Sequence, residues 1–160
     1  RITIKMHGKG ISQRDVILGS NIGTKKQFVV RAGQLVLSKI DARNGAFGIV
    51  PEELDNAIIT GNFWAYDINN LIDTDKYYLN YILFSEEFRK ICSMSSSGVT
   101  NRRYLDEELF LNQEIPLPKL DIQLKKVEEI RSIELKMKKL ENELNQLKFK
   151  VQDIICELWK

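Results

Sequence analysis

Three polar segments carry side-chain groups that contact phosphates and base edges in nucleic acids. They are Lys5–Arg14, which is followed by Thr24–Gln27, then Ser38–Gly45 and Ser97–Arg103. Lysine supplies counter-charge for phosphates, and glycine lets backbone N–H groups come close to them. Arginine forks onto guanine O6 and N7, and asparagine pairs with adenine N6 and N7. The segments together predict DNA contacts, although each alone also fits an ordinary polar turn.

The residues of these segments divide into two predicted roles. Phosphate contacts are assigned to Lys5, Lys9, Lys25, Lys26 and Lys39. Base-edge contacts are assigned to Arg43, Asn44, Asn101, Arg102 and Arg103. The charge distribution agrees, because residues 1–50 hold nine Lys and Arg against two Asp, while the whole chain has a net charge of +2. A basic region on a nearly neutral protein is typical of polyanion binding, although scattered solvated lysines are the alternative.

Signals for catalysis and for cofactor binding are missing. The sequence has no glycine-rich strand–helix loop for S-adenosylmethionine, no Asn/Asp-Pro-Pro-aromatic motif and no P-loop. Asp73 and Asp75 precede a predicted helix, where capping explains them. His7 is the only histidine and has no evident partner. We therefore expect a non-enzymatic chain that uses no metal and no cofactor.

The elements that must position these groups follow from the apolar pattern. Short β-rich stretches separated by glycines predict strands at Ile2–Ile4, Phe28–Val30, Gln34–Ile40, Phe47–Val50, Ala57–Thr60 and Phe63–Ile68. The second half predicts helices from Asp75 to Leu83 and from Ser85 to Cys92, a loop at Ser93–Asn101 and a short helix or strand at Leu105–Leu111. The expected fold class is α+β, with a β-rich domain and small helices.

The C-terminal region predicts one long helix with a coiled-coil seam. Apolar residues alternate at spacings of three and four, at Ile130, Ile133, Met137, Leu140, Leu144, Leu147, Val151, Ile154 and Leu158. This is the a/d stripe of about four heptads, which asks for a partner helix. A helix that folds back on its own domain is the alternative. Charges of both signs flank the seam, with Glu129, Lys136, Glu143, Lys150 and Glu157 at g positions and Glu134, Glu141 and Lys148 at e positions. At the level of sequence, parallel and antiparallel pairing of the helices both stay open.

The chain therefore divides into two predicted domains. Residues 1–119 form a recognition domain, and residues 120–160 form a coiled-coil spacer or dimerisation helix. Pro116 and Pro118 keep the connector between them extended, because proline disfavours helix in the residue before it.

Several features predict the cellular setting. Cys92 and Cys156 have no metal-ligand spacing, which is typical of buried thiols in a reduced, cytoplasmic protein. No signal peptide or membrane span is expected. Because the chain begins at Arg1 rather than Met, we also expect a preceding N-terminal piece.

Four stretches resemble the DNA-specificity (S) subunit of type I restriction–modification systems. Gly33–Pro51 and Ile59–Trp64 are similar to the core of one class of target recognition domain. Ile115–Gln123, with its apolar-Pro-Leu-Pro pattern before a Gln, is similar to the join between recognition domain and spacer helix. Asp153–Trp159 also suits the end of that helix.

The resemblance implies a subunit that reads a bipartite double-stranded DNA target and recruits methyltransferase (M) and restriction (R) subunits, which hold the catalytic sites. Such subunits usually carry two recognition domains, each followed by a long helix, and the two helices pack antiparallel. This chain has one of each. It is therefore either half of a longer subunit, with a second spacer helix elsewhere, or a half-size subunit that forms a homodimer, and we favour the homodimer.

Two other hypotheses stay open at the level of sequence. The chain could be the C-terminal specificity segment of a fused restriction–methyltransferase enzyme, with catalytic motifs upstream of Arg1. It could also be a coiled-coil adaptor that binds no DNA, in which case salt-sensitive DNA binding is absent.

Overall fold

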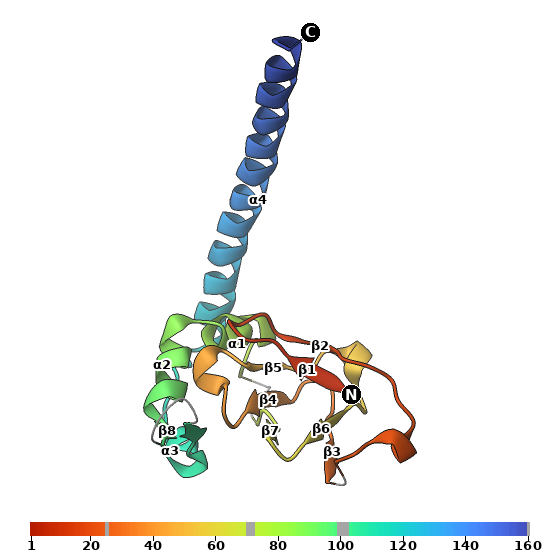
Figure 1. The fold of residues 1–160 in the computed structure, drawn as a ribbon. Coiled ribbons are helices and arrows are strands. Elements are labelled where there is room, and N and C mark those ends of the chain that lie inside the picture. The colour runs from red at the N-terminus through yellow and green to blue at the C-terminus, as the bar shows by residue number, and fades with distance from the viewer. Residues whose placement is uncertain (25, 70–72, 99–102, 160) are drawn as a thin grey trace. The chain divides into compact units, whose positions relative to one another are not determined.

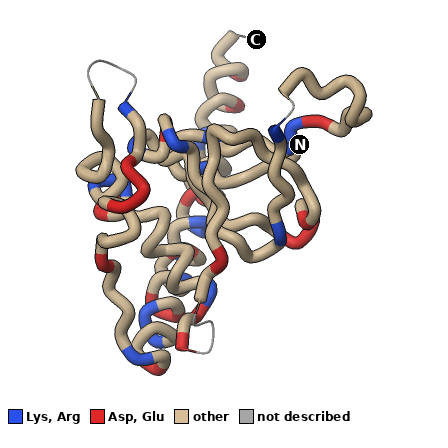
Figure 2. Tube along the Cα trace, turned by 90° about the horizontal axis from the view of Figure 1, so that it is seen from below, with Lys and Arg blue, Asp and Glu red and all other residues tan. Residues whose placement is uncertain are grey.

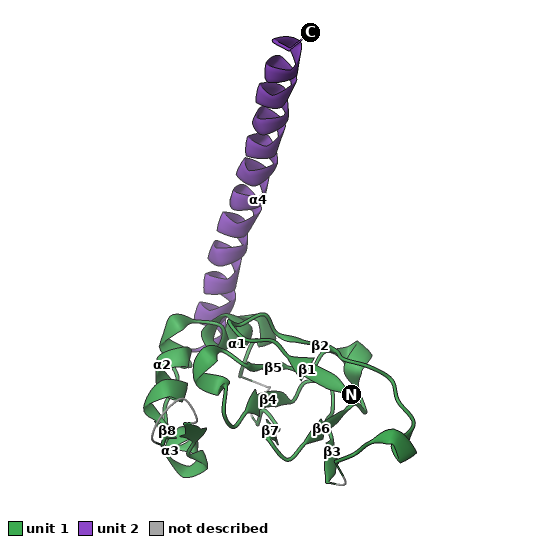
Figure 3. Ribbon diagram, viewed as in Figure 1, with its two compact units in different colours: residues 1–117 green, residues 118–160 purple. Residues whose placement is uncertain are grey.

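The computed structural model describes residues 1–24, 26–69, 73–98 and 103–159. The chain divides into two compact units, Arg1–Leu117 and Pro118–Lys160, which are called unit 1 and unit 2 below (Figures 1 and 3). Within these described ranges, unit 1 holds the strands, three short α-helices and three 3₁₀ helices, and unit 2 is one long helix. The predicted α+β class is confirmed.

Unit 1 begins with a β-hairpin. Strand β1 (Ile2–Ile4) pairs antiparallel with β2 (Ile11–Gln13). Beyond the paired residues, Arg1 Nε donates to Asp15 Oδ1 at 2.7 Å and Arg1 Nη2 to Asp15 Oδ2 at 2.5 Å. The sequence did not predict β2, which lies within the polar segment Lys5–Arg14. The short segment alternates too little to reveal β2 without its partner strand.

A three-stranded antiparallel sheet forms the centre of unit 1. Its strand order is β5-β4-β7, with β4 at Leu35–Ser38, β5 at Phe47–Ile49 and β7 at Phe63–Tyr66. A separate two-stranded sheet joins β3 (Gln27–Val29) to β6 (Ile58–Thr60). The 3₁₀ helices η1 (Gly19–Asn21), η2 (Ala42–Asn44) and η3 (Glu52–Leu54) lie in the connections.

The central sheet separates two hydrophobic clusters, because successive side chains of a strand point to opposite faces. Leu37 and Trp64 pack in one cluster, together with Phe47 and the small helices. Val36 and Phe63 pack in the other, together with Ile2. The pattern of the strands thus places one core on each face.

Two helices follow the sheet, and each begins at a side-chain cap. In α1 (Lys76–Leu83), Asp75 accepts hydrogen bonds from the backbone N–H groups of Tyr77 and Tyr78. In α2 (Glu86–Met94), Ser85 Oγ accepts one from Phe88 N. The predicted cap of α1 at Asp75 and the predicted start of α2 at Ser85 are therefore confirmed.

The end of unit 1 differs from the prediction. The segment predicted as a loop at Ser93–Asn101 continues α2 to Met94 and then forms β8 (Ser96–Ser97), which pairs with β9 (Tyr104–Leu105). Helix α3 (Glu107–Leu111) follows. The pairing is a tertiary feature that the polar sequence of β8 does not reveal.

Unit 2 is helix α4 (Leu120–Glu157), with 38 residues and a length of about 57 Å at 1.5 Å per residue. Gln123 Nε2 donates to the carbonyl oxygen of Pro118 at 2.6 Å, which holds the connector to the first turn of the helix. The glutamine that follows the apolar-Pro-Leu-Pro pattern therefore has a structural role. None of the described helices combines the length and apolar character that a membrane span requires.

Candidate nucleic-acid interface

The turn of the first hairpin is fastened to η2. His7 N donates to the carbonyl oxygen of Asn44 at 2.7 Å, and Gly8 N donates to that of Gly45 at 3.1 Å. Two of the segments predicted to contact DNA therefore lie side by side. The turn holds Lys5 and Lys9, and η2 holds Arg43 and Asn44. These residues are called the turn–η2 surface below: Lys5, Lys9, Arg43 and Asn44.

Backbone conformation makes this close approach possible. Gly45 follows η2 in the left-handed region, with φ 79°. A Cβ atom at this position would lie 2.7 Å from Gly8 N, which is closer than real contacts allow. His7, on the other side, also has a positive φ of 62°. The junction therefore requires a glycine at position 45.

Hydrogen bonds within the Ser38–Gly45 segment hold η2 in shape. Ser38 Oγ accepts from Asp41 N at 3.1 Å, and Asn44 Nδ2 donates to Asp41 Oδ1 at 3.2 Å. Ala42 is buried, with 1% of its surface exposed. Arg43 and Asn44 are half-buried on this platform. A rigid platform lowers the entropy cost of ordering side chains on binding.

Lys26 and Lys39 lie at a second place, each over an aromatic ring. Lys26 Nζ lies 5.5 Å from the ring centroid of Phe28, and Lys39 Nζ lies 5.0 Å from that of Trp64. Both rings line one groove of about 440 Å³. Figure 1 shows that the hairpin turn and β3 lie at opposite ends of unit 1. Figure 2 likewise shows basic positions at several separate places along the trace.

Arg103 makes contacts within the fold. Its Nη2 donates to the carbonyl oxygen of Ser96 at 2.7 Å, across the β8–β9 pair. Next to it, Leu105 N donates to the carbonyl oxygen of Lys39 at 2.7 Å. The Arg103 guanidinium, which is predicted to contact a base edge, thus also stabilises the β8–β9 pair, close to the backbone of Lys39. The other predicted contacts Lys25, Asn101 and Arg102 lie outside the described residues.

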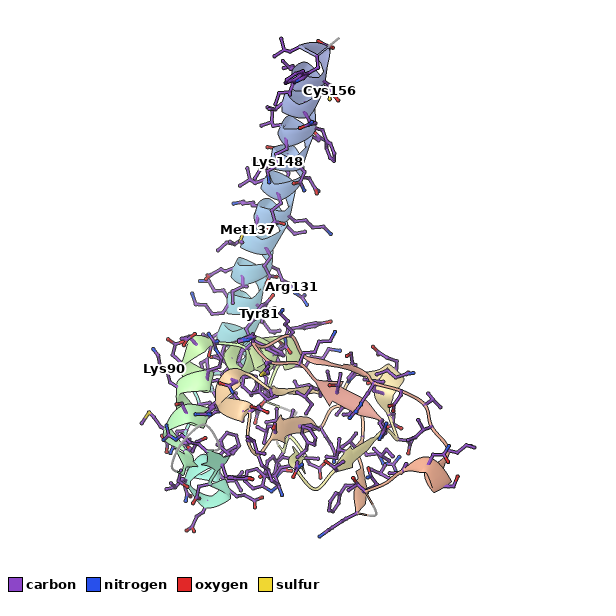
Figure 4. All side chains as sticks on the ribbon, in the orientation of Figure 1. Tyr81, Lys90, Arg131, Met137, Lys148 and Cys156 are labelled. Carbon is purple, nitrogen blue, oxygen red and sulfur yellow. The ribbon has the colours of Figure 1, made fainter. Side chains whose placement is uncertain are left out.

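The predicted seam of α4 is exposed along most of its length. Ile130 is half-buried, and the other eight residues are 51–80% exposed. Leu158 lies one residue past the helix, as its C-cap, so the last predicted seam position lies just outside the helix. Side chains project along the whole of α4 in Figure 4, where Met137 and Lys148 are labelled. Large exposed apolar patches are typical of interaction surfaces.

The cysteines do not form a reactive pair or a metal centre. Cys92 is fully buried, and burial raises the pKa of its thiol to about 12. Cys156 is exposed on α4, so the prediction that both thiols are buried is wrong for Cys156. Among the described residues, no group of three or more His, Cys, Asp or Glu is placed to hold a metal ion.

The aromatic walls of the groove are residues that sequence reasoning missed. Phe28, Phe63 and Trp64 are typical of buried strand residues, so their pattern predicts only a core. The available signal was Lys26, two residues before Phe28, which places a cation next to an aromatic side chain.

Comparison with known proteins identifies the family. The chain matches the type I restriction modification DNA specificity domain over residues 2–149. No curated protein matches it in sequence.

Two solved structures share the fold. The HsdS subunit from Thermoanaerobacter tengcongensis is 19% identical, with a TM-score of 0.66 over 86% of this chain and 35% of that chain. A chain from a structure on complex assembly and conformational transition of the type I R-M system is 20% identical, with a TM-score of 0.61 over 79% of this chain and 32% of that chain. This chain spans about a third of the length of both. Because the family match covers most of its residues, the chain belongs to the type I restriction modification DNA specificity domain family.

Proposed function

We propose that this chain is a sequence-specific DNA recognition module of a type I restriction–modification specificity subunit. The observation that carries the proposal is the junction between the hairpin turn and η2, through the hydrogen bonds of His7 and Gly8. It brings two lysines suited to phosphates next to an arginine and an asparagine suited to base edges. Family membership supports the same function.

In this proposal, unit 1 is the recognition domain and α4 is the spacer helix. Catalysis belongs to the methyltransferase and restriction subunits that the module directs to its target. The chain uses no cofactor of its own. The fused-enzyme and adaptor hypotheses have no such support from the described residues.

We further propose that a second copy of α4 covers the exposed seam. In antiparallel pairing, a residues of one helix face d residues of the other, and g faces g while e faces e. One register pairs Leu144 with Leu147 of the other copy and uses every seam residue from Ile133 to Leu158.

The flanking charges favour this register. It brings together only opposite charges, in the pairs Lys136–Glu157, Glu143–Lys150 and Glu141–Lys148, each of which occurs twice. A shift of the antiparallel register by one heptad in one direction places Lys136 opposite Lys150 of the other copy and Glu143 opposite Glu143 of the other copy. A shift in the other direction places Lys150 opposite Lys150 of the other copy. Parallel pairing brings Glu129 to Glu134. Like charges at such positions disfavour those arrangements.

The experiment that tests the function combines selection and mass measurement. Duplex DNA with a randomised region is selected for retention by the chain, and light scattering measures the mass of the free chain and of the complex. We expect a dimer, salt-sensitive binding and a bipartite motif with two symmetric halves. A monomer with a single half-site would mean that the partner helix belongs to another segment or chain. Binding without a motif, or no binding, would contradict the proposed function.

A further inference from the structure

The groove beside β3, β6 and β7 has the composition of a ligand site. It is lined by Phe28, Val29, Gln34, Lys39, Ile59, Phe63, Trp64 and Ala65. Its volume, about 440 Å³, is within the range of small-molecule sites, roughly 300–1,000 Å³. Among the residues that the structure describes, the lining is largely apolar and contains one cation and no acidic side chain.

Two lining residues on β3 are unusually exposed for their type. Phe28 is 43% exposed and Val29 is 56% exposed, although both belong to a three-residue strand. Exposed apolar side chains that line a groove mark a binding surface more readily than ones scattered singly over a surface. The other side of the groove is formed by Phe63 and Trp64 of β7, which pairs with β4 in the central sheet.

The lysines at the rim indicate the charge of the ligand. Lys26 and Lys39 each place an ammonium group about 5 Å from a ring of the groove. A ligand with a flat apolar part and an adjoining negative charge matches this arrangement. A nucleotide within DNA has both, as a base and its phosphates.

We propose that this groove, which is separate from the turn–η2 surface, holds a nucleobase of bound DNA against Phe28 and Trp64 while Lys26 and Lys39 neutralise the neighbouring phosphates. The inference rests on the proposed function and adds a second contact to it. The base reaches the groove either as the methyl edge of a thymine in the duplex or as an unpaired base. Both sources have the same chemistry, an apolar base surface beside a phosphate.

The test uses Trp64 as a reporter. The chain contains two tryptophans, so the variant Trp159→Phe leaves only Trp64. The selected duplex, the same duplex with deoxyuridine for thymidine, and the corresponding single strand are titrated while fluorescence is recorded. We expect bound DNA to change the emission of Trp64. If the deoxyuridine duplex binds more weakly than the selected duplex, the group in the groove is a thymine methyl. If the single strand changes the emission as much as the selected duplex does, or more, the group is an unpaired base.

Variants complete the test in the same background. Phe28→Ala is expected to weaken DNA binding by about 5- to 150-fold, the loss typical of one base–aromatic contact. The matched control is Tyr77→Ala, because Tyr77 is 45% exposed and also lies beneath a lysine, at 5.2 Å from Lys76 Nζ, but lies outside the groove. Lys26→Met removes the charge and keeps an aliphatic side chain, so it tests the rim even if Phe28→Ala folds poorly.

The outcomes separate this inference from the proposed function. Suppose that the chain binds DNA with a motif and a salt dependence, but that Trp64 emission does not change and Phe28→Ala and Lys26→Met bind with wild-type affinity. This result would contradict base binding in the groove and leave the proposed function intact. If, in addition, Trp64 emission changed when a partner subunit was added, the groove would be a protein contact. That result would also contradict base binding in the groove. Absence of DNA binding by the parent chain contradicts both proposals.

Discussion

At the scale of single residues, Gly45 determines whether the two halves of the turn–η2 surface can meet. Its left-handed backbone ends η2, and its missing Cβ leaves room for the backbone of the hairpin turn. The hydrogen bonds from His7 and Gly8 then connect residues that are far apart in sequence. The position of Lys5 and Lys9 relative to Arg43 therefore depends on one residue without a side chain.

Gly45→Ala is expected to destabilise the chain by about 1–3 kcal/mol, the cost of a left-handed alanine, with a further loss from the contact with Gly8 N. Urea unfolding followed by circular dichroism measures the change. Gly10→Ala is the matched control, because Gly10 has a φ of 73° and its Cβ would meet nothing within 4 Å. Equal losses in the two variants would contradict the close approach described for Gly45.

Arg43→Ala is expected to weaken binding to the selected target by about 1–3 kcal/mol and to relax the preference at one base pair, because a guanidinium discriminates guanine. Binding is measured on the target and on its single-base variants. Lys138→Ala, which removes a charge from an exposed position of α4, is the control and should change little. An equal loss on every sequence would make Arg43 a phosphate contact.

At the scale of elements, local and non-local interactions explain which predictions succeeded. The caps of α1 and α2 are contacts within a few residues, so Asp75 and Ser85 could be identified from sequence. Strands β2 and β8 depend on partner strands elsewhere in the chain, so their short polar segments did not predict them. The heptads of α4 predicted a helix with an exposed apolar stripe, and the stripe is exposed. Its pairing stays a proposal.

Charge exchange on α4 distinguishes the two helix orientations. Lys136→Glu is expected to raise the dimer dissociation constant roughly tenfold, because the change turns two attractive pairs into repulsive ones. In the antiparallel register, adding Glu157→Lys should restore the affinity, since these positions face each other. Adding Glu141→Lys should restore it only if the helices are parallel. Sedimentation equilibrium of the three variants at low salt makes the measurement, and rescue by Glu141→Lys would overturn the proposed orientation.

At the scale of the whole molecule, one recognition unit and one helix per chain would combine into two recognition units per dimer. An isologous dimer presents the same DNA-binding surface twice, related by a two-fold axis. Binding both half-sites at once increases affinity because the second contact is intramolecular. Dimerisation through α4 and DNA affinity should therefore change together.

Leu144→Asp is expected to abolish the dimer and to weaken binding to the bipartite target by about 100-fold or more, while binding to a single half-site is unchanged. Light scattering and DNA titration measure the two effects. Leu135→Asp is the control, because Leu135 is 70% exposed on α4 but lies off the seam. If Leu144→Asp weakened half-site binding as well, the seam would have a role in folding rather than in avidity.

The sequence by itself determined the α+β class, the long helix with its apolar stripe and the segments that carry basic and amide groups. These follow from local pattern and composition, because periodicity, capping and proline act within a few residues. Only the tertiary structure decided which of these groups meet. In the structure, the hairpin turn contacts η2 next to Gly45. Lys26 and Lys39 lie beside the groove rather than at the turn–η2 surface, and Arg103 donates a hydrogen bond across the β8–β9 pair. Such contacts join residues distant in sequence, and no local pattern encodes them.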